Sequence, residues 1–238
     1  MMECKKYIMD ILVDYKENEL FFASDVYNRE LRDKCSEAAF YKTLERLTKS
    51  GELIKVSKGV YHLPMISKYG LVPISSDEIV ETFIKNNSGT IVGYSLYNSL
   101  NITTQIPKVI NIISSSLESQ TKNIQNVNIK RVSLYYTREI ERMIHALEVL
   151  QDFNNIEDIN YLAFISFIKE IVEEYNDKTF EDVISNINYK KSTIAFLQEI
   201  LNYFNKENNL FLYLSSFSKY NHPTMEEIYE ASRTQIRV

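Results

Sequence analysis

The chain has 238 residues, of which 45% are hydrophobic and 25% are charged, and a formal net charge of −5; this is the composition of a globular protein of one or two domains. It contains no run of about 18 apolar residues, no secretory leader pattern and only two cysteines, Cys4 and Cys35, so we expect a cytoplasmic protein without a membrane association or a disulfide scaffold. The acidic balance excludes extended electrostatic binding of nucleic acid, because DNA affinity comes largely from phosphate neutralisation, and any DNA site has to be a local patch.

The first 64 residues are expected to begin with three helices. Apolar residues at helical spacing mark the first helix, and residues 21–25 are expected to open a second helix with Ser24 as its N-cap. Ser36 is placed to cap a third helix, and Gly51 stands where a C-terminal helix glycine belongs.

A β-hairpin is expected after these helices. Two short alternating runs, residues 52–57 and 60–63, flank a tight turn at Lys58-Gly59. Three helices followed by a hairpin is the order of a winged helix-turn-helix domain, which we predict for residues 1–64.

The remainder of the chain is predicted to contain a small α/β unit and a helical region. Within residues 65–136, helices are expected over 77–87 and 92–100 and strands over 108–114 and 127–134. Residues 137–238 carry 10 basic and 17 acidic side chains, hold none of the five glycines, and are expected to be helical and to avoid DNA. In that region the apolar segment 210–217 is expected to be buried, and Thr224 to cap the last helix. The predicted fold class is therefore α+β, mostly α, in three parts.

The third helix carries the strongest candidate for a binding surface. Lys42, Arg46 and Lys49 recur at positions i, i+4 and i+7, about opposite the apolar residues of the same helix. A recognition helix in the major groove needs this arrangement, with one face docked on its domain and a basic face toward bases and phosphates. The predicted DNA-binding residues are Lys42, Arg46, Lys49, the flanking Tyr41 and Thr43, and Lys55 and Lys58 on the wing.

Weaker candidates accompany this helix. Arg29, Arg32 and Lys34 precede it and are positioned to add phosphate contacts. The alternative is a solvated helix face without a ligand, since Glu45 is spaced to pair with Lys49.

Catalytic motifs are not found in the sequence. His62, His145 and His222 have no His or Cys neighbour at metal-ligand spacing, and nucleotide-binding, hydrolase and metalloprotease signatures are missing. The paired acidic residues at 157–158, 173–174 and 226–227 are interpreted as solvated faces. We therefore expect a protein that is not an enzyme and that has no cofactor or metal.

Two segments resemble the AbiEi abortive-infection antitoxin family of type IV toxin–antitoxin systems. The first contains the helix exit Leu44, Leu47, Gly51 and Leu53, followed by the wing Lys58–Tyr61 and Pro64. The second is the antitoxin-domain signature, which consists of Gly93, Leu100, Thr103, Thr104, Gln105 and Pro107. The match covers roughly the first 135 residues, and the signature is its more specific part.

The resemblance implies a protein with two roles. The winged helix would bind double-stranded DNA at its own operator and repress the operon. The following domain would counteract a nucleotidyltransferase-like toxin, and this family does not require a stable complex with the toxin. From the residues alone, Gly93 and residues 103–105 look like a capped turn that Pro107 ends, and a purely structural role for this signature stays open. The alternative functions are a winged-helix protein-interaction module and a transcriptional regulator without a toxin partner.

Overall fold

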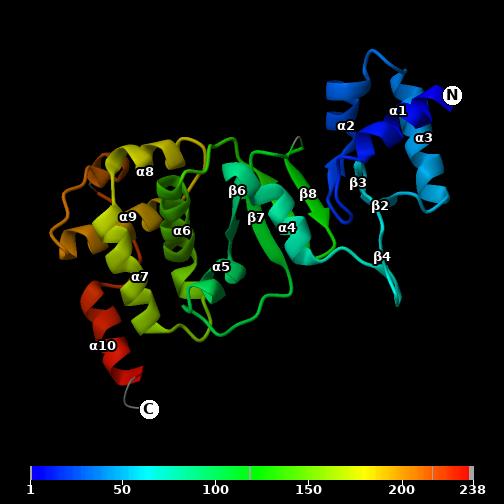
Figure 1. Cartoon of the computed structure of the whole chain (residues 1–238). Helices are drawn as coiled ribbons and strands as arrows, with labels where there is room; N and C mark the ends of the chain where they lie inside the picture. Colours follow the sequence, from blue (N-terminus) through cyan, green and yellow to red (C-terminus); the bar gives the residue numbers. More distant parts are fainter. Residues whose placement is uncertain (1, 118, 216, 236–238) are drawn as a thin grey trace. The chain divides into compact units, whose positions relative to one another are not determined.

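The computed structural model describes residues 2–117, 119–215 and 217–235 and divides into two compact units (Figure 1). The first comprises Met1–Thr82 with Asn123–Val127, and the second comprises Phe83–Lys122 with Asn128–Val238. The expected boundary at residue 64 lies inside the first unit and that at residue 136 inside the second, so the three-part division stays a prediction. Helices are combined with small sheets, which confirms the mixed α+β class.

The first unit contains short helices and two antiparallel β-structures. Its three-stranded sheet has the order β1-β3-β2, and a separate hairpin pairs β4 with β5. The elements in chain order are α1 (Met2–Leu12), β1 (Phe21–Phe22), α2 (Ala23–Val26) with a π-helical turn (Tyr27–Leu31), α3 (Glu37–Lys49), β2 (Ile54–Ser57), β3 (Val60–His62), β4 (Met65–Ser67), β5 (Gly70–Val72) and α4 (Ser76–Ile84), which crosses into the second unit.

Strand β1 is an element that the sequence pattern did not reveal. Phe21 pairs with Tyr61 and Phe22 with Val60, so β1 adds a third strand to the predicted hairpin. Because Phe22 is extended, α2 begins at Ala23 and Ser24 lies inside the helix. The prediction of Ser24 as N-cap was therefore wrong, whereas Ser36 caps α3 by accepting a hydrogen bond from the Ala39 amide.

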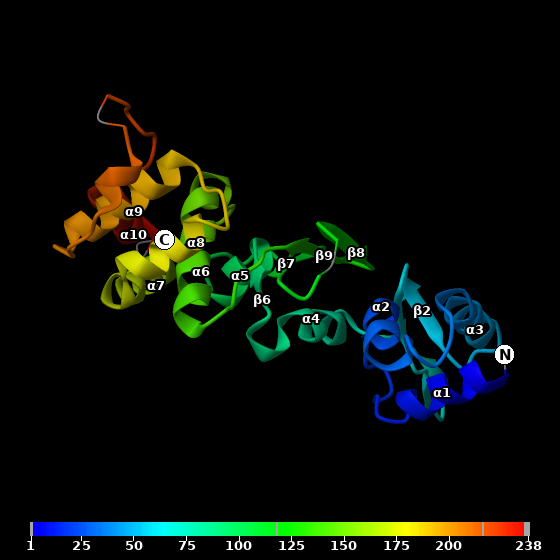
Figure 2. The same cartoon turned by 90° about the horizontal axis from the view of Figure 1, so that it is seen from above.

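Helix α3 is fixed by the apolar core of the first unit. Phe40, Leu44 and Leu47 are buried together with Ile8 and Leu12 of α1. The grouping of α1, α2 and α3 beside β2 is visible in Figures 1 and 2. Burial of such side chains contributes about 1.5–3 kcal/mol each, so this face of α3 is strongly committed to the core.

The second unit contains most of a four-stranded sheet, of which only Asn123–Val127 belong to the first unit, and a helical bundle. The sheet has the order β6-β7-β9-β8, and α6 packs against α7, α8 and α9. Its elements are the single turn Lys85–Asn87, β6 (Gly89–Val92), α5 (Tyr94–Ser99), β7 (Ile110–Ser114), β8 (Thr121–Ile124), β9 (Val127–Arg131), α6 (Arg138–Asp152), the turn Phe153–Asn155, α7 (Tyr161–Glu174), α8 (Asp177–Ile184), α9 (Lys191–Tyr203), the turn Leu210–Tyr213 and α10 (Met225–Gln235).

The two ends of the helical region differ in how well they were predicted. Thr224 and Glu227 cap α10 reciprocally, as the sequence indicated. The expected burial of segment 210–217 was wrong: Leu210 is fully buried, but Phe211 and Phe217 are 60% and 100% exposed. A short 3-10 turn points its side chains in different directions, so one residue reaches the core while its neighbours face solvent.

Helix α6 carries polar side chains that bond to the elements around it. The Thr90 hydroxyl of β6 donates to the Glu141 carboxylate and lies 2.8 Å from Nε2 of His145. The Tyr189 hydroxyl donates to Glu148 at 3.0 Å.

Among the described residues, no helix is both long enough and apolar enough to span a bilayer.

The buried His145 gives the second unit a predictable dependence on pH. Burial lowers the pKa of His145 to about 4, while Glu141 raises it and Arg142 lowers it further. His145 takes up a proton near pH 6.5 in the unfolded chain but only near pH 4 in the folded chain. The free energy of unfolding therefore decreases as the pH falls from about 6.5 to about 4, by about 3 kcal/mol in total from this residue.

Denaturant unfolding at pH 7 and pH 4.5 measures this effect. We expect His145→Gln, which cannot gain a charge, to lose less unfolding free energy between the two pH values than the unsubstituted protein does. Equal losses in the two proteins would contradict the assignment.

Candidate nucleic-acid interface

The exposed face of α3 presents the three cations that the sequence singled out. Lys42, Arg46 and Lys49 are all solvent-exposed, opposite the buried Phe40, Leu44 and Leu47. This orientation follows from the core, because the helical period places residues three and four apart on one face. The helix therefore meets the geometric requirement for entering a groove.

A carboxylate lies within this basic face. Glu45 is exposed and accepts a hydrogen bond from Lys49 Nζ at 2.7 Å. Lys49 holds the pKa of Glu45 below its ordinary value, with smaller effects from Lys42 and Arg46. The face thus carries a net charge of about +2, and a ligand phosphate has to replace Glu45 as the partner of Lys49.

The two uncharged candidates on α3 have different positions. The Tyr41 side chain is 38% exposed and packs edge-on against Phe40, so it lies at the border of the exposed face. Thr43 is 4% exposed, and its hydroxyl donates to the Ala39 carbonyl at 2.8 Å. Because its hydroxyl is buried and already bonded, the placement of Thr43 does not support the predicted DNA contact, and we exclude it from the interface.

The hairpin β2–β3 displays the other two predicted cations. Lys55 is exposed on β2 opposite Tyr61, and Lys58 is exposed in the turn. Gly59 follows at a φ of +75°, a conformation that favours glycine, and its carbonyl accepts the Ala23 amide at 2.9 Å. This bond ties the turn to α2 and fixes where Lys58 projects.

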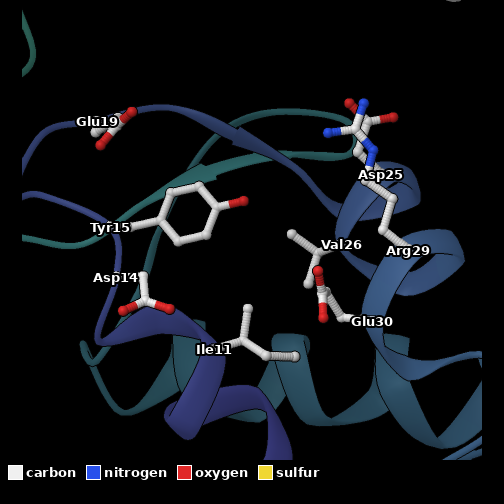
Figure 3. Close-up of a pocket in the computed structure, with 8 residues that line it drawn as sticks. All are labelled: Ile11, Asp14, Tyr15, Glu19, Asp25, Val26, Arg29 and Glu30. Atoms are coloured by element: carbon white, nitrogen blue, oxygen red, sulfur yellow. The ribbon is translucent and has the colours of Figure 1, made fainter.

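An acidic pocket occupies another part of the first unit. It has a volume of about 340 Å³, and Figure 3 shows the side chains around it. Its lining consists of Ile11, Asp14, Tyr15, Glu19, Asp25, Val26, Arg29 and Glu30. Arg29 therefore stands among four carboxylates, which repel phosphate, and its placement argues against the phosphate contact that the sequence suggested.

The segment Gly93–Pro107, which the sequence analysis compared with an antitoxin family, holds two loops of the second unit together through hydrogen bonds; these bonds of Thr103 and Gln105 are called the pin below. Thr103 is buried, donates to the Glu157 carbonyl at 2.7 Å and accepts from the Gln105 amide at 3.2 Å. Gln105 also donates from its side chain to Asp158 at 2.9 Å. These bonds tie the loop after α5 to the loop before α7.

The remaining signature residues have less direct placements. Gly93 precedes α5 at a φ of +69° and lies close to Asn111, so a side chain at this position would be strained. Thr104 is exposed and Pro107 is half-buried. Together with the pin, these placements favour a structural role for the segment over a ligand site.

Each of the three histidines contacts a different part of the chain, and the contacts of His145 with α6 and β6 are given above. His62 is buried and bonds to the Leu63 carbonyl, and the ring of His222 stacks on Phe196. Over residues 2–117, 119–215 and 217–235, no cluster of three His, Cys, Asp or Glu side chains could hold a metal ion.

The cysteines of the first unit are close to each other. The Sγ atoms of Cys4 and Cys35 lie 2.7 Å apart as two free thiols, Cys4 within the core. Burial raises the pKa of Cys35 to about 11, and the bond to Cys4 adds to this shift, so this thiol is protonated at neutral pH and is a weak nucleophile.

Hairpin β4–β5 was not predicted from the sequence, and it lies directly after hairpin β2–β3. Its tip exposes Lys68 and Tyr69, the latter to 87%. The signal that could have indicated it is the pair of apolar residues on each side of the turn segment Ser67–Gly70, Met65-Ile66 before it and Leu71-Val72 after it.

The pin predicts a contrast between two adjacent threonines. Thr103→Val removes the hydroxyl bonded to Glu157 and leaves that carbonyl unpaired, which is expected to cost about 1–3 kcal/mol of unfolding free energy. Thr104→Val changes an exposed side chain and is expected to alter it by less than about 0.5 kcal/mol. Chemical denaturation of both variants checks this contrast, and equal effects would show that the Thr103 bonds do not stabilise the fold.

Residues 8–125 match the model of a family of unknown function, DUF6088. No curated protein matches the chain. Among solved structures, the chain is similar to the RV2827C protein from Mycobacterium tuberculosis, with 10% identity, a TM-score of 0.43, and coverage of 84% of this chain and 76% of that one.

Proposed function

We propose that this protein is a cytoplasmic transcriptional repressor that binds double-stranded DNA at its own operator through a winged helix. The observation that carries the proposal is the basic exposed face of α3, held outward by its buried opposite face, next to a hairpin with cations at its exposed positions. The third strand, β1, supports the winged-helix assignment, since it closes a small sheet behind the helices.

Each part of this unit has a role in the proposal. Helix α3 enters the major groove, where Arg46 and Lys42 meet base edges and phosphates. Lys55 and Lys58 contact the neighbouring backbone from the wing, and Lys49 exchanges Glu45 for a phosphate. Tyr41, at the border of the exposed face, adds a contact to sugar or phosphate.

The second part of the proposal is that the protein is the antitoxin of a type IV toxin–antitoxin system and counteracts a nucleotidyltransferase-like toxin. It rests on the resemblance of the sequence to the AbiEi family. The second unit, with its pinned loop at Thr103 and Gln105, is the part to which we assign this activity. A stable complex with the toxin is not part of the proposal.

A protein-interaction module is the second candidate function. Large exposed apolar side chains gathered in one short segment favour it, because exposed apolar side chains that adjoin one another are typical of protein–protein contact sites. These are Phe211, Leu212 and Phe217. In this alternative, the cations of α3 are a solvated face.

A salt titration on the DNA directly upstream of the gene separates the two candidates. If about four of the cations neutralise phosphates, log K should fall with log salt at a slope of about −4. Arg46→Ala is expected to weaken operator binding by about 5- to 150-fold and Lys42→Ala to reduce the slope by about 1.

The control variant is Lys6→Ala, which removes an exposed cation from α1 of the same unit. It should leave operator affinity unchanged, while thermal melts verify that all variants are folded. Binding of the upstream DNA no tighter than random DNA would refute the repressor and leave the interaction module.

A further inference from the structure

We propose that hairpin β4–β5 is a second DNA-binding arm, which enters the minor groove beside the site of α3. The inference rests on the proposed repressor function and extends it to a segment that neither α3 nor the wing includes. It concerns Met65–Val72, in which four large apolar side chains are exposed: Met65, Ile66, Tyr69 and Leu71.

The arm is well formed although it has only two strands. Met65 pairs with Val72, Ile66 with Leu71 and Ser67 with Gly70, leaving Lys68 and Tyr69 as a two-residue turn. The Ser67 hydroxyl donates to the Gly70 carbonyl at 3.0 Å and accepts the Tyr69 amide at 3.2 Å. These bonds fix the tip, and Gly70, at a φ of +110°, completes the turn.

The base of the arm is attached to the first unit, and its tip is exposed. The Asn18 amide lies 3.9 Å from the Met65 sulfur at the base. Toward the tip, Ile66, Leu71 and Tyr69 are 73%, 59% and 87% exposed. Figure 1 shows β4 extending away from α1, α2 and α3. An isolated two-stranded ribbon with an uncovered apolar face is marginal in water, so this segment is expected to acquire a partner.

Charge identifies DNA as that partner. Residues 53–76, which hold both hairpins, contain Lys55, Lys58 and Lys68 and no acidic residue, although the whole chain carries −5. A second copy of the arm would bring charge of the same sign, whereas the duplex brings the opposite sign.

The chemistry of the arm also fits the minor groove. The walls of the minor groove are sugars, which can contact apolar side chains such as Ile66 and Leu71. The phosphates at the rim of the groove can pair with a cation. Lys68 Nζ lies 4.9 Å from the centre of the Tyr69 ring, so the tip presents an aromatic surface and a cation together. Only two residues separate β3 from β4, so the arm is joined directly to hairpin β2–β3, which the proposed function places on the DNA backbone.

The test uses the full-length protein and two versions of its upstream duplex. In the second version, every adenine is replaced by 2,6-diaminopurine, which adds an amino group to the minor groove and leaves the major-groove edge unchanged. The arm variant is the pair Ile66→Ser and Tyr69→Ser, and Lys68→Gln is a second, milder variant. Matched controls in the same unit are Val13→Ser, at a side chain that is 81% exposed, and Lys6→Gln.

We expect the arm variant to bind the natural duplex at least about tenfold more weakly than the unsubstituted protein and the controls do. Diaminopurine should weaken the unsubstituted protein to a similar extent and leave the arm variant unaffected. Circular dichroism melts check that every variant is folded.

Three outcomes overturn the inference in distinguishable ways. If the unsubstituted protein does not bind the duplex specifically, the repressor function fails and the arm fails with it. If binding is specific but indifferent to the arm variant and to diaminopurine, only the arm is refuted. If sedimentation without DNA shows a dimer that the arm variant abolishes, while operator affinity per protomer is unchanged, the occupant is a second copy of the chain.

Discussion

The burial of one side of α3 is the constraint on which the proposed interface depends. Phe40, Leu44 and Leu47 are held in the core of the first unit, and the helical period then leaves Lys42 and Arg46 no orientation except toward solvent. The same core holds Phe21, which pairs with Tyr61 and so sets the position of hairpin β2–β3. One set of apolar contacts thus fixes both halves of a surface that carries positive charge in an acidic protein.

In the first unit, the positions of the charged side chains matter more for binding than the net charge of the unit. Four carboxylates line the pocket near α2, while the α3 face and both hairpins carry six of the 12 basic side chains of the unit. The unit has 12 basic and 14 acidic side chains, a net charge of −2, but it can still bind a polyanion at one surface, because the potential near a phosphate depends on the charges within a Debye length of about 8–10 Å. Glu45 is the exception, and its pairing with Lys49 tunes rather than removes the positive face.

Some features could be predicted from the sequence because their signal is local. The periodic apolar residues and the caps at Ser36 and Thr224 define helices without any tertiary information. Strand β1 has two residues and exists only through its pairing with β3, so no periodicity could reveal it. The burial of Thr43 and the exposure of Phe211 depend on the direction in which one short element meets the core, which the residue types do not encode.

Lysine footprinting with and without the upstream duplex tests the central claim most directly. Acetylation followed by mass spectrometry reports on the reactivity of every lysine in one experiment, and it uses the unsubstituted protein. We expect DNA to protect Lys42, Lys55 and Lys58 from acetylation, while Lys6 of α1 and Lys169 of α7 react at the same rate in both states. Unchanged reactivity at Lys42, Lys55 and Lys58 under conditions where the duplex is bound would contradict it.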